Sequence, residues 1–124
     1  METKKPPVFL DLRLIKMPAA ALASIGHRAS GVFIALLVPF MLYLLELSLS
    51  SQEGFNQATL LMESSGAKIL LMLVLWASFH HLFAGIRFLF ADIHIGVNRE
   101  QGRLTALVVI ATAPVAAIIV GLLL

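Results

Sequence analysis

The chain alternates between long apolar stretches and short polar ones, and this pattern predicts three membrane-spanning helices. Residues 31–50, 67–90 and 104–124 are each apolar over about 20 positions, the length at which an α-helix crosses the hydrocarbon core of a bilayer. Proline suits the first turn of a helix, so we expect the first helix to begin near Pro18 and its early turns to project into the headgroup region. The predicted helices therefore cover about 18–48, 67–90 and 104–124.

The polar stretches define the rest of the organisation. Residues 1–17 form an N-terminal segment, and residues 18–124 form an all-α, three-helix membrane-anchor domain. Residues 48–66 are polar, and we expect a loop there with a short surface helix around 55–62. Residues 94–102 are expected to be a short polar turn that leads back into the membrane.

The amino-acid composition supports a membrane protein and excludes several kinds of catalytic or metal site. The 124 residues are 60% hydrophobic and 13% charged, against roughly 45–50% and 25% in soluble domains. Cysteine is absent, which excludes disulfides and thiolate metal sites. The sequence also lacks a glycine-rich phosphate loop, a paired-carboxylate site, a Ser-His-Asp arrangement and zinc-ligand spacing. We therefore expect no catalysis by this chain alone, and any substantial chemistry requires a cofactor or a partner subunit.

The charges are distributed unequally between the two sides of the predicted spans. Basic residues lie before the first span and around the connection between the second and third, namely Lys4, Lys5, Arg13, Lys16, Arg28, Arg87, Arg99 and Arg103. The other connection carries Glu53 and Glu63, with Lys68 beside them. The positive-inside rule then predicts a cytoplasmic N-terminus and an external C-terminus. This basic charge is a topology signal rather than a nucleic-acid footprint, and the lack of a transit-peptide-like extension favours a bacterial cytoplasmic membrane.

A polar and basic cluster stands at the start of the first apolar stretch. Ser24, His27 and Arg28 are spaced i, i+3 and i+4, which predicts that they share one helical face. One interpretation is interface anchoring, because arginine and histidine snorkel to headgroups. The other is a binding site, in which the hydroxyl and guanidinium hydrogen-bond a quinone carbonyl and stabilise negative charge on it as it is reduced.

His81 is the sharpest candidate for cofactor binding. It lies about 14 Å into the bilayer by helix rise, where an imidazole is costly unless it is neutral and bonded. One interpretation is a haem-iron ligand, with Gly85 one turn on leaving room for a flat macrocycle. The other is a histidine that hydrogen-bonds a neighbouring helix. His80 points about 100° away, so it is expected to be an outer-shell or interfacial residue.

The remaining features are expected to serve packing. Arg87 and Asp92 can form an ion pair or a docking contact near the end of the second helix. Ala113, Ala117 and Gly121, spaced i, i+4 and i+8, form a stripe of small residues that allows close helix packing.

Two motifs at this spacing resemble a known family. Leu10-Asp11-Leu12, Pro18 and Ser24-Ile25-Gly26-His27-Arg28-Ala29-Ser30-Gly31 closely resemble the start of the first membrane helix of the cytochrome b556-type large anchor subunit of succinate dehydrogenase (complex II). His81, Gly85-Ile86-Arg87 and Asp92 resemble that family's second-helix signature. The similarity covers nearly the whole chain, including Glu53-Gly54-Phe55. One departure is Phe88, at a position where the family often has histidine.

The resemblance implies a role in electron transport. In that family two small anchors of three helices each hold a flavoprotein and an iron–sulfur subunit on the membrane, and electrons from succinate reach ubiquinone. Carried onto this chain, His81 is an axial ligand of a b-type haem, and the partner anchor supplies the other ligand. Ser24 and Arg28 line the quinone pocket, and His27 and Arg28 lie near the haem propionates. The alternatives are a menaquinol:fumarate reductase anchor and a haem-free structural anchor.

Overall fold

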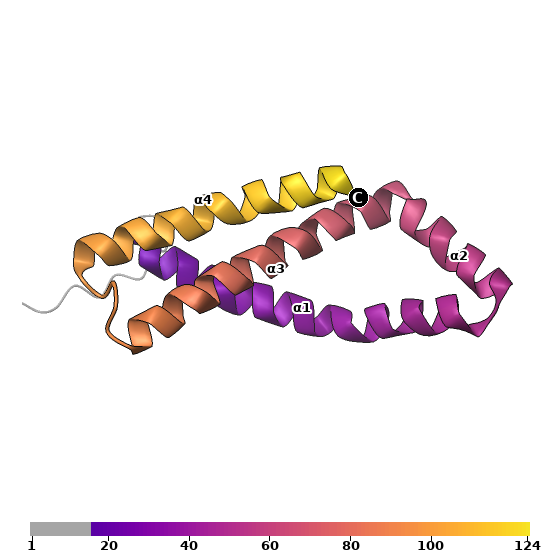
Figure 1. The fold of residues 1–124 in the computed structure, drawn as a ribbon, viewed down its shortest axis with the longest axis horizontal. Coiled ribbons are helices and arrows are strands. Elements are labelled where there is room, and N and C mark those ends of the chain that lie inside the picture. Colours follow the sequence, from indigo (N-terminus) through magenta and orange to yellow (C-terminus); the bar gives the residue numbers. More distant parts are fainter. Residues whose placement is uncertain (1–15) are drawn as a thin grey trace, which may run out of the picture.

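The computed structural model describes residues 16–124, and this part of the chain is helical apart from short connections. Its helices are α1 (Ala19–Ser50), α2 (Gln52–Glu63), α3 (Ser65–Asp92) and α4 (Arg99–Leu123), as labelled in Figure 1. Within these residues, α1, α3 and α4 are long and apolar enough to cross a membrane. The expectation of an all-α chain with three spanning helices is therefore confirmed. The N-terminal motif Leu10-Asp11-Leu12 lies outside the described residues.

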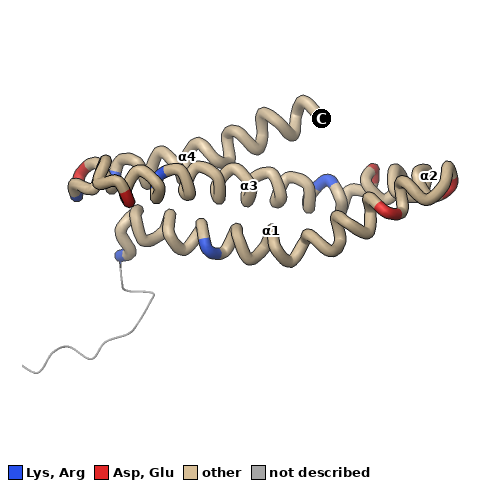
Figure 2. The backbone as a smooth tube through the Cα atoms, turned by 60° about the horizontal axis from the view of Figure 1, so that its bottom comes forward, with Lys and Arg blue, Asp and Glu red and all other residues tan. Residues whose placement is uncertain are grey.

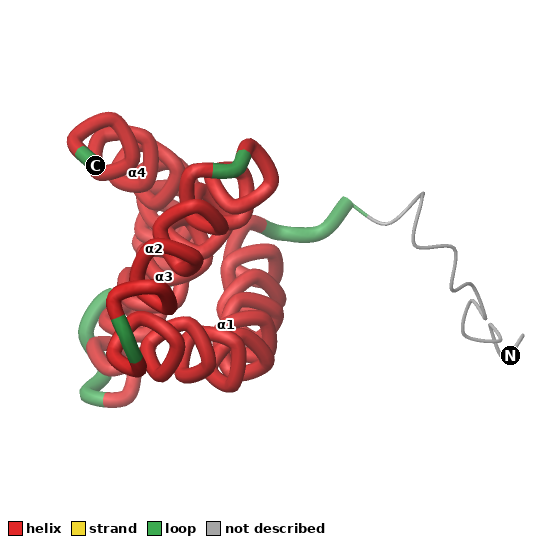
Figure 3. Tube along the Cα trace, turned by 90° about the vertical axis from the view of Figure 1, so that its right-hand side faces the viewer, coloured by secondary structure: helices red, strands yellow, loops and turns green. Residues whose placement is uncertain are grey.

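The three long helices form one bundle. Each contacts the other two, and the interface between α3 and α4 is the most extensive. Figure 1 shows short connections at the two ends of the bundle, and Figure 3 views the bundle end-on. The helix of 32 residues, α1, is about 48 Å long by helix rise, so it is longer than the hydrocarbon core of a bilayer.

Small side chains make the contacts between helices. The residues with 0–2% exposure are almost all alanines, namely Ala23, Ala77, Ala84, Ala106, Ala113 and Ala117, together with Ser30. Large apolar side chains such as Leu36, Leu89 and Leu122 are instead exposed on the outside of the bundle. This inside-out distribution is typical of membrane helices, where small residues allow close backbone approach and lipid covers the large side chains. The expected stripe on α4 takes part, because Gly121 lies against Met72 of α3.

The expected surface helix is present as α2, and serines define both of its ends. Ser51 precedes it and accepts a hydrogen bond from the Gly54 amide at 3.0 Å. Ser64 follows it and caps α3 by accepting a hydrogen bond from the Ala67 amide at 3.2 Å. Serine side chains satisfy the free amides of a first turn, so single residues suffice to separate these helices.

The expectation of a polar turn over 94–102 is wrong in its second half, because α4 begins at Arg99. The carbonyl of Asn98 accepts a hydrogen bond from the Gly102 amide at 2.7 Å, and Glu100 lies in the first turn, where the helix dipole favours a carboxylate. The connection is therefore only residues 93–98. It reverses the chain with positive φ angles at His94 (63°) and Gly96 (74°). The first helix likewise begins at Ala19, with Pro18 at the cap position rather than in the first turn.

Charged residues lie toward the two ends of the bundle. Figure 2 shows mainly basic residues toward the end with the α3–α4 connection and mainly acidic residues around α2, with a long uncharged stretch between the two groups. An uncharged stretch of this kind suits the hydrocarbon core.

Candidate functional site

The side chain of His81 is held against α1 by its Nδ1 atom. This atom lies 3.0 Å from the His27 carbonyl oxygen and 3.3 Å from Ser30 Oγ. A carbonyl only accepts hydrogen bonds, so Nδ1 carries the proton and donates it. The Ser30 hydroxyl donates to the same His27 carbonyl at 2.9 Å, which leaves its oxygen free to accept from His81. The His81 ring is thereby set in the tautomer whose Nε2 has a free lone pair.

The Nε2 atom of His81 has no hydrogen-bond partner among the described residues. No fully buried side-chain nitrogen or oxygen within residues 16–124 lacks a partner, so Nε2 is at least partly accessible. A neutral imidazole with Nδ1–H bonded to a carbonyl and Nε2 open is the usual state of a metal-ligating histidine. No three His, Cys, Asp or Glu side chains of the described residues come together as a metal site. Within residues 16–124, a metal bound to His81 therefore has no set of three such ligands.

His27 lies directly beside His81. The two rings are stacked, with centroids 4.1 Å apart and an interplanar angle of 11°. Phe88 meets His27 edge-on at 5.2 Å, so the residue that departs from the family pattern packs on this imidazole. The space expected beside Gly85 is occupied by the His27 ring, whose Nε2 would lie 3.5 Å from a Cβ at that glycine. Residues from α1 and α3 thus form one compact cluster of rings.

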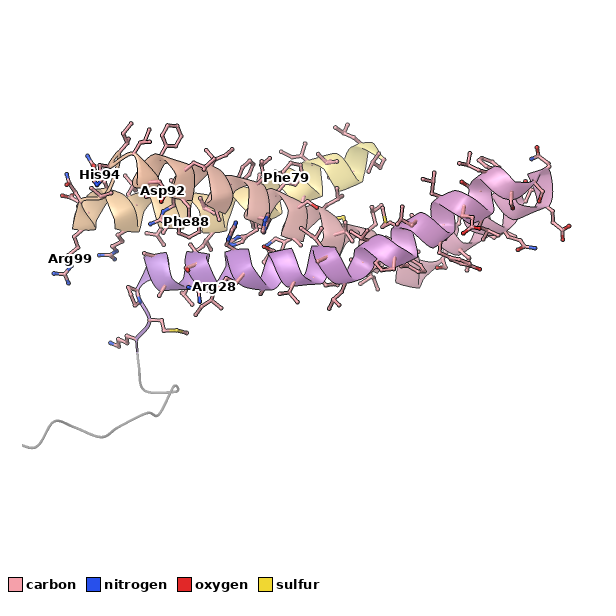
Figure 4. The ribbon with its side chains drawn as sticks, turned by 90° about the horizontal axis from the view of Figure 1, so that it is seen from below. Arg28, Phe79, Phe88, Asp92, His94 and Arg99 are labelled. Carbon is pink, nitrogen blue, oxygen red and sulfur yellow. The ribbon has the colours of Figure 1, made fainter. Side chains whose placement is uncertain are left out.

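Arg28 points away from this cluster and is linked to Ser24. The Arg28 guanidinium donates a hydrogen bond to Ser24 Oγ at 3.3 Å, and Figure 4 shows Arg28 on the side of α1 away from α3. There it lines a shallow groove with Ile25, Ala29, Val32, Phe33 and Leu36. The prediction that Ser24, His27 and Arg28 share one face is therefore wrong for His27. Adjacent helical residues point about 100° apart, and α3 packs on the side of α1 that carries His27.

Ser30 had no role assigned from the sequence, and His80 was expected to be an outer-shell or interfacial residue. Ser30 is 1% exposed and its hydroxyl joins His27 and His81, although its only sequence signal is a hydroxyl three positions after His27 in an apolar run. His80 is 4% exposed and also contacts α1, since its Nε2 lies 3.4 Å from the Ala23 carbonyl. Both buried contacts depend on which face of α3 packs on α1.

Arg87 joins α3 to α4. Its Nε donates to Thr105 Oγ1 and its Nη2 to the Gly102 carbonyl, both at 3.1 Å. These bonds take the place of the ion pair with Asp92 that the sequence suggested. Asp92 is exposed at the end of α3.

Comparisons with known proteins agree with this architecture. Residues 2–120 match the family described as the succinate dehydrogenase/fumarate reductase transmembrane subunit. The chain is 37% identical over 118 residues to the succinate dehydrogenase cytochrome b556 subunit of Coxiella burnetii, a match that covers 94% of each chain. It is 29% identical over 113 residues to the protein of that name from Paracoccus denitrificans, covering 91% of this chain and 87% of the relative. The chain belongs to the family of succinate dehydrogenase/fumarate reductase transmembrane subunits, and it is a multi-pass membrane protein.

Proposed function

We propose that this chain is a membrane-anchor subunit of succinate dehydrogenase that helps to pass electrons from an iron–sulfur subunit to ubiquinone. Both relatives are named cytochrome b556 subunits of succinate dehydrogenase, which supports a succinate-oxidising complex over a menaquinol:fumarate reductase. The chain is non-catalytic on its own, because flavin and iron–sulfur chemistry belong to the other subunits. Its partners are the flavoprotein, the iron–sulfur subunit and a second small membrane anchor that completes the helical bundle.

His81 supplies one axial ligand of a b-type haem, and the second anchor supplies the other. The observation that carries this proposal is the bond from His81 Nδ1 to the His27 carbonyl, because it leaves Nε2 as a lone-pair donor. When bound, the haem supplies a one-electron redox centre. His27, which stacks on His81, lies near its propionates. Arg28 points away from His81, so its guanidinium can pair with a propionate only at the outer face of α1.

Ser24 and Arg28 form part of the ubiquinone-reduction site. Their mutual hydrogen bond aligns a hydroxyl and a guanidinium on the outer face of α1, where a neighbouring subunit closes the pocket. The hydroxyl and guanidinium donate hydrogen bonds to a quinone carbonyl. The positive charge of Arg28 stabilises the negative charge that develops on this oxygen during reduction.

The chain is oriented with its N-terminus in the cytoplasm of a bacterium and its C-terminus outside the inner membrane. Lys16, Arg99 and Arg103 line one hollow where α1 and α4 begin, and Glu53 and Glu63 belong to α2. Basic residues are retained on the cytoplasmic side, which supports this topology. Residues 1–17 then form a cytoplasmic segment ahead of the membrane-anchor domain over residues 18–124.

An optical difference spectrum of the purified complex tests the haem proposal. We expect a sharp b-type α-band in the dithionite-reduced minus oxidised spectrum of the native complex. The band is lost, or becomes high-spin, in the His81→Ala variant. A native complex without the band is a haem-free structural anchor, and a band that the mutation leaves unchanged assigns the ligand elsewhere.

A comparison of two activities tests the quinone site. Ser24→Ala and Arg28→Leu should lower ubiquinone reduction while succinate oxidation by an artificial dye continues. Arg99→Leu, which removes an exposed charge from the same end of the bundle, is the matched control. Equal loss of both activities would indicate failed assembly instead of a quinone site.

A further inference from the structure

We propose that His80 is a positioning residue, which with Gly26 sets the spacing of α1 and α3 at which His81 meets the His27 carbonyl. We call the contact between His80, Gly26 and the Ala23 carbonyl the histidine latch. The inference rests on the proposed haem ligation by His81 and adds a residue that controls this ligand without touching the haem.

The histidine latch is a close and buried contact. The His80 side chain is 4% exposed, and its Nε2 lies 3.4 Å from the Ala23 carbonyl oxygen. A Cβ at Gly26 would overlap this Nε2 atom, so the ring fits only because the residue opposite is glycine. On its other side the ring stacks with Trp76, with centroids 5.7 Å apart and an interplanar angle of 29°. The imidazole is therefore held between a helix backbone and an indole.

The same kind of contact occurs one helical turn further along α1. His80 faces the carbonyl of Ala23, and His81 faces the carbonyl of His27, four residues later. A Cβ at Gly31 would likewise approach His81, at 2.8 Å from Cε1. Two consecutive side chains of α3, about 100° apart around its axis, both reach α1 only when the two backbones are close. The two histidines therefore depend on a single helix–helix spacing.

The hydrogen-bond partners of the two rings assign them opposite tautomers. The atom facing a carbonyl must carry the proton, which is Nε2 in His80 and Nδ1 in His81. His80 thus uses for packing the nitrogen that His81 keeps for a ligand. If the histidine latch opens, the His27 carbonyl moves away from His81 Nδ1. The loss of that hydrogen bond lowers the basicity of the ligating imidazole and frees its ring to turn.

Two substitutions at position 80, made in the assembled complex, separate positioning from simple packing. His80→Leu keeps an apolar side chain but removes the donor, whereas His80→Gln places an amide N–H near the position of Nε2. We expect His80→Leu to transfer haem to an excess of apomyoglobin about 10-fold faster than the native complex, and to shift the haem midpoint potential. His80→Gln should restore both values. Phe79→Leu is the control, because Figure 4 shows Phe79 on the side of α3 away from α1.

A second pair of variants covers the case in which His80→Leu does not assemble. Gly26→Ala should release haem faster than the native complex, because the added Cβ displaces His80. In a His80→Ala background the same change should add no further loss, since the ring it displaces is absent. If Gly26→Ala speeds haem release as much in the His80→Ala background as in the native complex, the contact between Gly26 and His80 does not position His81.

The outcomes distinguish this inference from the haem proposal. If His81→Ala removes the haem but His80→Leu keeps the native haem potential and release rate, the histidine latch is wrong and haem ligation stands. If the native complex has no haem, both proposals fail. Equal loss in the Leu and Gln variants would mean that ring volume, and not the hydrogen bond, sets the spacing.

Discussion

Replacing Gly31 with alanine is expected to weaken haem binding, although the same change stabilises most helices. A Cβ at Gly31 would lie 2.8 Å from His81 Cε1 and 3.3 Å from Nδ1, whereas ordinary contacts begin at 3.4 Å. The ring must therefore move by about 0.6 Å, a displacement of the kind that overpacked cores force on side chains. Moved away from α1, it lengthens the 3.0 Å bond to the His27 carbonyl to about 3.6 Å, which is no longer a hydrogen bond.

The expected loss of haem affinity follows from the role of the hydrogen bond between His81 Nδ1 and the His27 carbonyl. Removing the partner of a metal-ligating histidine reduces metal affinity about 10- to 100-fold. This corresponds to about 1.4–2.8 kcal/mol. Alanine is favoured over glycine inside a helix by about 1 kcal/mol, so backbone propensity alone would change stability in the opposite direction. Weaker haem binding in Gly31→Ala would therefore indicate the contact with His81, whereas a general effect on α1 would be stabilising.

The assay is haem content relative to flavin in the purified complex, together with the rate of haem transfer to apomyoglobin. Gly66→Ala is the matched control, because Gly66 also lies in a helix and has open space where its Cβ would be. If Gly31→Ala keeps haem as tightly as Gly66→Ala and the native complex, the contact with Gly31 does not position His81.

Three further predictions concern other parts of the chain. Arg87→Leu should lower the free energy of unfolding of the complex by about 1–3 kcal/mol, measured by thermal denaturation, because it removes the hydrogen bonds to Thr105 and Gly102. An unchanged melting temperature would contradict this. His94→Gly should raise the free energy of unfolding by about 1 kcal/mol, because φ is 63° at this residue and glycine adopts such an angle without strain. A lower melting temperature in this variant would contradict the prediction. The chain expressed without its partner anchor should bind haem weakly, and stoichiometric low-spin haem in an optical spectrum would refute shared ligation.

The number and kind of elements followed from the sequence because they depend on local properties. Runs of apolar residues of spanning length predicted α1, α3 and α4, and the weakly amphipathic stretch around Phe55 predicted α2. The start of α4 was predicted too late, because polarity places a residue outside the hydrocarbon core and does not end a helix. Arg99 and Gly102 are polar or small, yet both belong to α4.

The sequence marked candidate site residues but not how they are arranged. Ionisable side chains in or beside an apolar stretch are costly in lipid, so position alone marked His27, Arg28 and His81 as candidates. Ser24 was added because of its spacing from His27 and Arg28. Spacing along one helix could not tell which face α3 would cover. Tertiary packing decided that His27 joins His81 while Arg28 faces outward.

The sequence by itself therefore determined the membrane class, the helices and the candidate residues, since each is a property of one residue or one segment. Only the tertiary structure decided the partner of His81, because that partner is the backbone carbonyl of His27. Every residue has a backbone carbonyl, so the residue type at position 27 does not predict a hydrogen bond to that carbonyl. It exists because Gly26 and Gly31 let α3 approach α1 closely enough for two imidazoles to reach its backbone.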